Sequence, residues 1–309
     1  MSYQHTPVML REVLELMKPE NGKKYLDGTL GGGGHAEKIL ELSSPDGRLL
    51  GLDRDDEAVT AARQRLQRFG DRCVIRQANF AGSEEILKEI GWGKVDGIVL
   101  DLGVSSQQID SLERGFSFHS PHRLDMRMDR RQLLDAYQVV NGLSATDLER
   151  IFRDYGEERR ARRVALAIDK ERRAQKIESA RELAEIVSRA LGRAHGRTHP
   201  ATRIFQALRI AVNRELETLA SFLENACELL MPKGRMAVIS FHSLEDRLVK
   251  AAFRKWSKSC LCPPRTPVCR CGWSAKVTLL TGRPLVASPE EVRMNPRSRS
   301  AKLRAVERL

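Results

Sequence analysis

Residues Tyr25 to His35 read YLDGTLGGGGH, and the fold prediction starts from this segment. Apolar residues lead into four consecutive glycines, which is the pattern of a strand that enters a ligand-binding loop. Glycine tolerates positive φ and lets a ligand approach the backbone, and residues 35–42 contain no helix breaker. A helix can therefore begin directly after the loop, with its free N–H groups facing a nucleotide-type ligand.

An acidic residue ends the next apolar segment. Residues 48–52 lead into Asp53, and doubly wound folds place an acid about 20 residues after the glycine loop, where it accepts hydrogen bonds from ribose hydroxyls. Loop and acid together predict an adenosine-bearing cofactor. Because Gly31, Gly33 and Ala36 also satisfy the G-x-G-x-x-G/A spacing, NAD stays open at this point.

Composition favours a globular protein with a polyanionic partner. The chain has 309 residues, of which 41% are hydrophobic, and 53 Lys+Arg against 41 Asp+Glu give a net charge of +12. Nucleic acid is the leading partner on this basis, although a merely solvated basic face would give the same charge. No apolar run approaches a membrane span and the N-terminus lacks a signal architecture, so we expect a cytoplasmic protein without a membrane partner.

Two later strands deliver further candidate residues to the ligand edge of the predicted sheet. Phe80 follows the strand at 73–78 and is either a purine-stacking ring or an ordinary core aromatic. Asp101 follows the apolar strand at 95–100, where a carboxylate can accept a hydrogen bond from an amino group. No His or Lys comes directly after this strand, which argues against hydride transfer and NAD.

The alternation of predicted strands and helices stops in the middle of the chain. We predict one discontinuous sheet domain of two segments, 1–111 and 201–309, interrupted by an inserted helical, basic substrate-recognition domain at 112–200. The arginines of residues 158–163 and the segment 189–199 suit phosphate contacts, unless they form only a solvated helix face. One long helix is expected over 201–231, followed by a strand at 235–241.

Four of the six cysteines lie close together in the sequence CLCPPRTPVCRCG. Cys260, Cys262, Cys269 and Cys271 form two C-x-C pairs, and four thiolates bind zinc tetrahedrally. Reduced buried thiols, or a zinc shared with a neighbouring chain, are the alternatives. A secreted disulfide framework does not fit a chain of this size.

Several of these motifs together resemble the RsmH family, also called MraW, in the same order along the chain. They are HTPVML, YLDGTLGGGGHA, GLDRD, DGIVLDLGVSS, GFSF, LDMRMD, HPATRIFQALRIAVNREL, SFHSLEDR and NPRSRSAKLR. The resemblance implies a class I S-adenosylmethionine-dependent methyltransferase, an α/β, Rossmann-like fold with a seven-stranded sheet and a helical insertion. It also implies methylation of the N4 amine of a decoding-centre cytidine in 16S rRNA of the small ribosomal subunit, and a homodimer.

Transferred residue by residue, the resemblance implies roles for individual side chains. The methionine end of S-adenosylmethionine would lie near Gly33, Gly34 and His35, with Asp53 on the ribose and Phe80 along the adenine. Asp101 and Gln108 are expected to complete the cofactor pocket, and Asp101 is also expected to hold the target amine. The residues expected to shape the pocket for the target base are Asp125, Arg127, Ser240 and His242.

Two features depart from the family pattern. Arg123 stands where many relatives have proline before the Leu-Asp-Met-Arg run, and the paired C-x-C loop is found in only part of the family. Two other functions also fit the sequence, namely a methyltransferase for another amine acceptor and a non-catalytic ribosome-assembly factor.

Overall fold

The computed structural model describes residues 7–192, 199–263, 266 and 268–309. It divides into two compact units, which are described separately. The sheet unit comprises the chain up to Gly103 and from Glu217 onward, and the helical unit comprises Val104–Leu216. Among the described residues, no helix is long and apolar enough to cross a membrane.

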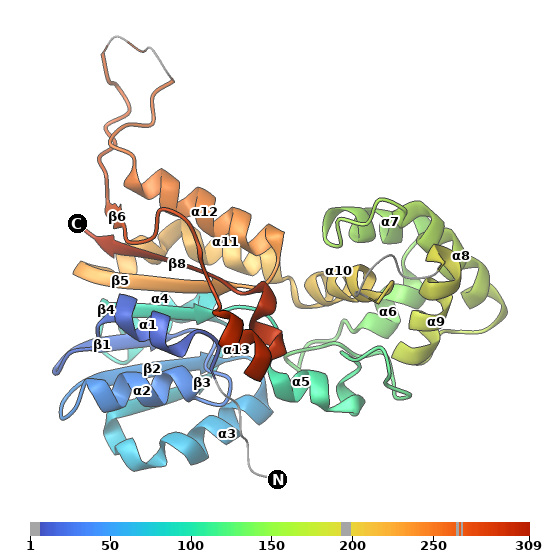
Figure 1. Ribbon diagram of the computed structural model, residues 1–309, viewed down its shortest axis with the longest axis horizontal. Coiled ribbons are helices and arrows are strands. Elements are labelled where there is room, and N and C mark those ends of the chain that lie inside the picture. Colours follow the sequence, from blue (N-terminus) through green and yellow to red (C-terminus); the bar gives the residue numbers. More distant parts are fainter. Residues whose placement is uncertain (1–6, 193–198, 264–265, 267) are drawn as a thin grey trace. The chain divides into compact units, whose positions relative to one another are not determined.

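The sheet unit contains a mostly parallel sheet (Figure 1). Its strands lie in the order β3-β2-β1-β4-β5-β8-β6. The first five are parallel, β8 is antiparallel to β5, and both β6 and β7 pair antiparallel with β8. The strands are β1 (Lys24–Asp27), β2 (Arg48–Asp53), β3 (Cys73–Gln77), β4 (Val95–Asp101), β5 (Leu230–Ser240), β6 (Val277–Leu279), β7 (Leu285–Val286) and β8 (Lys302–Arg308).

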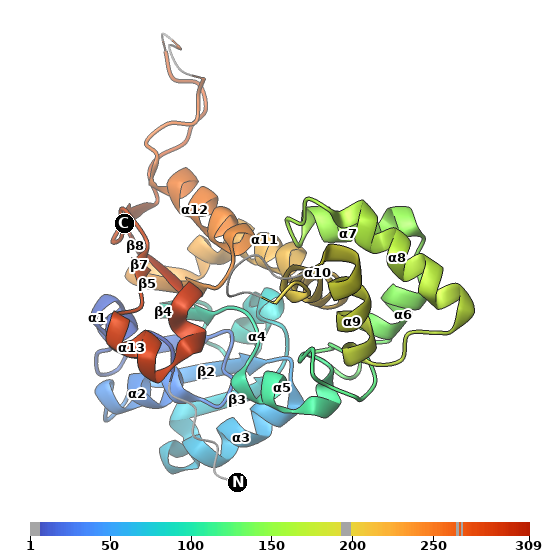
Figure 2. The ribbon, with the colours of Figure 1, turned by 45° about the vertical axis from the view of Figure 1, so that its right-hand side comes forward.

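Helices cover both faces of this sheet, because neighbouring strand residues point to opposite sides. Tyr25 packs in one core cluster with α1, α2 and α3, whereas Leu26 packs in the other with α4, α11 and α12 (Figures 1 and 2). The helices of this unit are α1 (Leu10–Met17), α2 (Gly34–Leu42), α3 (Asp56–Leu66), α4 (Ser83–Glu89), α11 (Glu215–Asn225, which begins two residues before the boundary), α12 (Ser243–Ser257) and α13 (Pro289–Met294).

The helical unit has a core of its own. Buried apolar residues of its four longest helices, for example Phe152 in α7 and Phe205 in α10, form one cluster with the loop residues Leu124 and Met126. Its helices are α5 (Ser106–Asp110), α6 (Ala136–Gly142), α7 (Ala145–Asp154), α8 (Ala161–Ala174), α9 (Ala180–Leu191) and α10 (Thr202–Asn213). Short 3-10 helices in the two units are η1 (Gln67–Arg72), η2 (Phe80–Gly82), η3 (Leu112–Arg114), η4 (Ala226–Leu229) and η5 (Pro296–Ser300).

The predicted fold class is confirmed, with corrections of detail. The sheet carries an eighth strand, the two-residue β7, within the described part of the chain. The helical unit extends beyond the expected 112–200, because the buried face of α10 packs in its core rather than against the sheet. Part of the basic segment 189–199 lies outside the described residues.

The prediction of one helix over 201–231 is wrong. Arg214 adopts the left-handed conformation (φ 50°, ψ 42°) and ends α10, and α11 begins at the next residue. Strand β5 then starts at Leu230, earlier than the expected 235, because Leu230 already pairs with Val95 of β4, ahead of a register shift between Val95 and Gly97. Such a bulge accommodates Pro232, which cannot donate to a regular ladder.

Candidate active site

The glycine loop between β1 and α2 is closely packed and partly left-handed. Gly33 caps α2 with φ 79°, a conformation that other residues adopt only with strain. A Cβ atom on Gly28 would lie 2.5 Å from Cδ2 of Leu100 and 2.9 Å from Cβ of Phe80, and one on Gly34 would lie 2.3 Å from Cγ of Pro7. Glycine is therefore required here for both space and conformation.

Asp53, the last residue of β2, holds this loop. Its Oδ2 accepts a hydrogen bond from the N–H of Gly31 at 2.8 Å, and its Oδ1 accepts one from the N–H of Asp55 at 2.9 Å. Burial raises the pKa of Asp53 overall, although the two N–H donors oppose the rise. The structure places Asp53 beside the loop, as the sequence predicts, and its contact with a ribose stays a prediction.

Asp101 ends β4 with an unused carboxyl oxygen. Its backbone N–H donates to Oγ1 of Thr29 at 2.6 Å, and its Oδ2 lies 3.9 Å from Nδ1 of His35. Its Oδ1 is buried and, among the described residues, has no hydrogen-bond partner. Burial, followed by the charge of Asp27, raises the pKa of Asp101 well above its usual range. A buried unpartnered oxygen is costly, which makes this atom a candidate contact for a ligand or substrate.

Asp27, at the end of β1, is a site residue that the sequence reasoning missed. It is buried, its Oδ1 accepts a hydrogen bond from the N–H of Thr29 at 3.1 Å, and burial raises its pKa to about 7. The strand-end rule that identified Asp53 and Asp101 would also have found it. These three carboxyl groups end neighbouring parallel strands, so their mutual repulsion favours a positively charged ligand.

His35 and Phe80 are both buried next to the loop. Nε2 of His35 lies 3.0 Å from the carbonyl oxygen of Val8, which orients the ring. Phe80 begins η2 and meets the ring of Phe222 edge-on, with the centroids 5.3 Å apart. The structure thus gives Phe80 a place in the core, and its stacking on a purine remains a prediction.

Ser240 and His242 follow the same edge of the sheet but have local structural roles. Ser240 is the last residue of β5 and donates through Oγ to the carbonyl oxygen of Lys302 at 3.4 Å. His242 caps α12: its Nδ1 accepts from the N–H of Glu245 at 3.4 Å, and the Glu245 carboxylate accepts from the N–H of Phe241 at 2.9 Å. A role of either residue toward a base is still a prediction.

The other predicted site residues lie in the helical unit. Gln108 forms a capping box with Ser105 at the start of α5. Arg127 donates from Nε and Nη2 to the two carboxylate oxygens of Asp125, at 2.7 and 2.9 Å. Burial tends to raise the pKa of Asp125, but the guanidinium outweighs it and the pKa is lowered. This ion pair therefore stays formed across the neutral range.

Three further residues shape the loop that carries this pair. Asn213 accepts from the N–H of Met128 and donates to the carbonyl oxygen of Met126, both at 2.8 Å, and Arg114 donates from a buried position to the carbonyl oxygens of residues 127 and 128. Arg123, the departure from the family pattern, bonds to Asp135 and stacks on Tyr137. Arg114 and Asn213 shape this loop through contacts with residues that are distant in the sequence, so no local motif identifies them.

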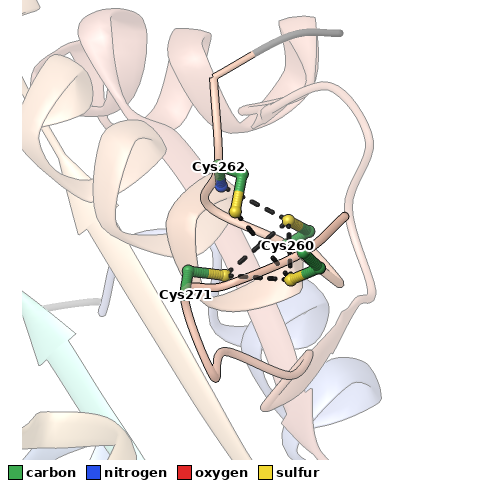
Figure 3. Close-up of side chains that lie close together, drawn as sticks. Cys260, Cys262 and Cys271 are labelled. Carbon is green, nitrogen blue, oxygen red and sulfur yellow. Dashed lines mark hydrogen bonds between the residues drawn. The ribbon is translucent and has the colours of Figure 1, made fainter. Parts of the chain in front are cut away.

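The four cysteines do come together. Their Sγ atoms all lie within 4.8 Å of one another, between α12 and β6 (Figure 3). Hydrogen bonds from the backbone N–H groups of Leu261 and Trp273 lower the pKa of Cys271 to about 6. The donor set suits a soft metal ion.

The strand order and the residues at the strand ends identify the class of enzyme. A strand order of 3-2-1-4-5 followed by an antiparallel strand, with a glycine loop after β1 and acids at the strand ends, is that of the class I S-adenosylmethionine-dependent methyltransferases. The chain belongs to the MraW methylase family, whose model matches residues 2–309. This membership decides against the NAD alternative.

Three relatives align along almost the whole chain, and each is called ribosomal RNA small subunit methyltransferase H. The protein of Syntrophotalea carbinolica is 53% identical over 309 residues, covering 99% of this chain and 98% of the relative. That of Geobacter sulfurreducens is 52% identical and covers 100% of both. That of Symbiobacterium thermophilum is 49% identical and covers 100% of this chain and 98% of the relative.

Proposed function

We propose that this methyltransferase modifies the N4 amine of a decoding-centre cytidine in 16S rRNA of the small ribosomal subunit, with S-adenosylmethionine as methyl donor. The observation that carries the proposal is the 53% identity, over nearly full length, to a relative named for methylation of small-subunit ribosomal RNA. The choice of cytidine N4 comes from the resemblance of the motifs to the RsmH family and is the finer part of the proposal.

The residues of the sheet edge fit the cofactor. S-adenosylmethionine, when bound, supplies an electrophilic methyl group on a positively charged sulfur. Gly33, Gly34 and His35 would hold its methionine end, Asp53 its ribose and Phe80 its adenine, with Gln108 completing the pocket. The fit is supported by the unpartnered Oδ1 of Asp101 and by the pKa values of Asp27 and Asp53, which burial raises, because a nearby cation stabilises the charged form of a buried carboxylate.

Asp101 is the residue that we propose for the acceptor. The lone pair of cytidine N4 is delocalised into the ring, so a hydrogen-bond acceptor must hold the amine in the attacking orientation, and positioning supplies much of the rate. A carboxylate of raised pKa is also a stronger proton acceptor than an ordinary one. We propose that Asp125, Arg127, Ser240 and His242 shape the base pocket.

The helical unit supplies exposed positive charge for the RNA. Arg159, Arg162 and Arg163 are exposed, and none of them makes an ion pair or hydrogen bond with the described residues. Unpaired arginines are free to contact phosphates, which hold the RNA independently of its sequence. The target base has to leave its stack to be modified, so we expect it to be flipped out.

Asp101→Asn tests the catalytic assignment, because it preserves shape and removes the strong proton acceptor. We expect turnover to fall by roughly 100-fold or more, and the dissociation constant for S-adenosylmethionine to rise by a smaller factor, because Asp101 also lines the proposed cofactor pocket. Full turnover in this variant would show that Asp101 does not hold or deprotonate the amine.

Labelled methyl transfer tests the acceptor. S-adenosylmethionine with a labelled methyl group is incubated with unmodified small subunits and, in parallel, with protein-free 16S RNA and with ribosomal proteins. Label in RNA supports the proposal, and label only in protein would assign another acceptor. No label despite tight cofactor binding by calorimetry would contradict the acceptor, and no cofactor binding at all would favour a non-catalytic assembly factor.

A further inference from the structure

The chain between α12 and β6 makes a long excursion from the sheet unit (Figures 1 and 2). Its base is well anchored: Nε1 of Trp273 donates to the carbonyl oxygen of Lys258 at 3.0 Å, and the N–H of Lys276 donates to the carbonyl oxygen of Trp256 at 2.8 Å. Beyond this base, the described part contains no helix or strand, and Val268 is 68% exposed. An apolar core therefore does not hold the two limbs together.

The two limbs meet through their cysteines. Cys260 and Cys262 lie on the outgoing limb, and Cys269 and Cys271 on the returning one. In Figure 3 the sulfur atoms of Cys260, Cys262 and Cys271 point toward one another. All four are free thiols, not disulfides. Their contacts therefore join the segment 260–262 to the segment 269–271 without a covalent bond.

The sulfur positions match one metal geometry. The Sγ of Cys269 lies 3.4 Å from that of Cys260, 3.5 Å from that of Cys271 and 3.9 Å from that of Cys262, and the Cys260–Cys271 distance is 3.7 Å. A tetrahedron with zinc–sulfur bonds of about 2.3 Å has sulfur–sulfur edges of about 3.8 Å. A disulfide would need about 2.05 Å. The spacing fits four ligands around one ion.

Backbone groups support the thiolate form that a metal requires. The N–H of Leu261 points at Sγ of Cys271, 3.4 Å away, and the N–H of Cys262 points at Sγ of Cys260, 3.3 Å away. Donors of this kind orient metal-bound ligands and stabilise their charge. The side chains are also accessible, so an ion can enter from solvent.

We propose that Cys260, Cys262, Cys269 and Cys271 bind one zinc ion, which cross-links the outgoing and returning segments of the loop between α12 and β6. Four sulfur ligands leave no open coordination position, so the ion is structural and takes no part in methyl transfer. Binding releases the thiol protons and couples the order of the two limbs to the metal. This proposal is independent of the proposed function, since it rests only on the cysteine geometry.

Metal analysis of the full-length protein, purified without chelator, is the first test. We expect one zinc per chain by plasma mass spectrometry, and less than one tenth of that in Cys260→Ser and in Cys269→Ser. Cys73→Ala is the matched control, because Cys73 lies in β3 outside the cluster and its loss should leave one zinc per chain.

Cobalt substitution tests the coordination geometry of the site, and hydrogen exchange tests whether the metal orders the loop. Cobalt added to the chelated protein should give the visible absorption of a tetrahedral thiolate site in Cys73→Ala but not in Cys260→Ser. Chelation should speed amide exchange in peptides covering 258–276 at least tenfold and leave β1, β2 and β4 unchanged. These sheet peptides also show whether a variant is folded.

Three results would overturn the proposal. The first is folded protein that contains no metal and takes up neither zinc nor cobalt. The second is an equal zinc content in the cysteine variants, which would locate the metal elsewhere. The third is iron in place of zinc in protein purified from metal-replete cells, which would assign a redox-active ion to the same ligands.

Discussion

The backbone N–H of Gly31 donates a 2.8 Å hydrogen bond to Oδ2 of Asp53, so the acid that ends β2 holds the glycine loop that follows β1. The other oxygen of the same carboxylate accepts from the N–H of Asp55 at 2.9 Å. Asp53 therefore fixes the shape of the loop before any ligand arrives. In the proposed function it also meets the ribose, so one side chain links loop conformation to cofactor affinity.

Replacing this acid should weaken cofactor binding. Loss of hydrogen bonds to a charged group costs about 1.5–3 kcal/mol, so we expect Asp53→Ala to raise the dissociation constant for S-adenosylmethionine by roughly 10- to 100-fold. Calorimetry measures it, with Asp56→Ala as control because that acid is exposed in the first turn of α3. An unchanged affinity in Asp53→Ala would remove Asp53 from the cofactor site.

Gly28 should tolerate no side chain. A Cβ atom there would lie 2.5 Å from Leu100 and 2.9 Å from Phe80, so Gly28→Ala overpacks the core next to the loop. We expect a loss of about 1–3 kcal/mol in the free energy of unfolding. Tryptophan fluorescence in urea reports on the sheet unit, because all three tryptophans lie in it. Gly82→Ala is the control, since nothing lies within 4 Å of a Cβ there, and equal stability of the two variants would contradict the packing argument.

Asp27 should make the ligand-free protein less stable as the pH rises. Its pKa is raised from 3.8 to about 7 by burial, so between these values the folded state binds more protons than the unfolded state. The free energy of unfolding then falls with rising pH, and the loss is complete above about pH 7. Its upper limit is ~4 kcal/mol, from 1.36 kcal/mol per pH unit over about three units.

The variant Asp27→Asn removes this titration and keeps an oxygen for the N–H of Thr29. We expect it to match the wild type near pH 4 and to be more stable near pH 8, with urea unfolding measured at both values. Because the neutral side chain no longer attracts a cation, affinity for S-adenosylmethionine should fall at pH 8. A pH dependence equal to that of the wild type would show that Asp27 is not the titrating group.

Two arginines of α8 should contribute to RNA affinity through salt-dependent contacts. Arg162 and Arg163 are exposed and make no ion pair with the described residues, whereas Arg150 and Arg153 of α7 are paired with nearby acids. Removing two phosphate contacts lowers the slope of log affinity against log salt by roughly 1.4–1.8.

The matched comparison is R162A/R163A against R150A/R153A, because both double variants change the net charge equally. Filter binding of 16S RNA over a salt series measures the slopes. We expect the first double variant to lose affinity and slope, and the second to stay close to the wild type. Equal effects would mean that net charge alone, and not this face of α8, attracts the RNA.

The acids at the carboxyl edge of the sheet can be predicted from the sequence, because each one directly follows an apolar strand. Apolar segments that end in Asp53 and Asp101, with glycines after β1, suffice to place both acids at the carboxyl edge of parallel strands. Asp27 obeys the same rule, but β1 is only four residues long and runs into the glycine loop, so its end is less distinct in the sequence.

The remaining features depend on contacts between distant segments. The helical pattern of residues 201–231 does not predict the left-handed backbone conformation of Arg214, which ends α10. The residues of α10 pack in the core of the helical unit, and such distant contacts cannot be read from the local sequence. Asn213 is important only because the backbone of residues 126 and 128 passes beside it. His242 could be located from the sequence, but its use as the cap of α12 appears only in three dimensions.

The identity of the methylated nucleoside shows whether this protein methylates cytidine N4 in 16S rRNA. Unmodified small subunits are incubated with the protein and S-adenosylmethionine, the 16S rRNA is digested, and the nucleosides are separated by liquid chromatography and mass spectrometry. We expect one new product, N4-methylcytidine, whose formation is strongly reduced in Asp101→Asn. A different methylated nucleoside, or N4-methylcytidine formed at an undiminished rate by that variant, would contradict this expectation.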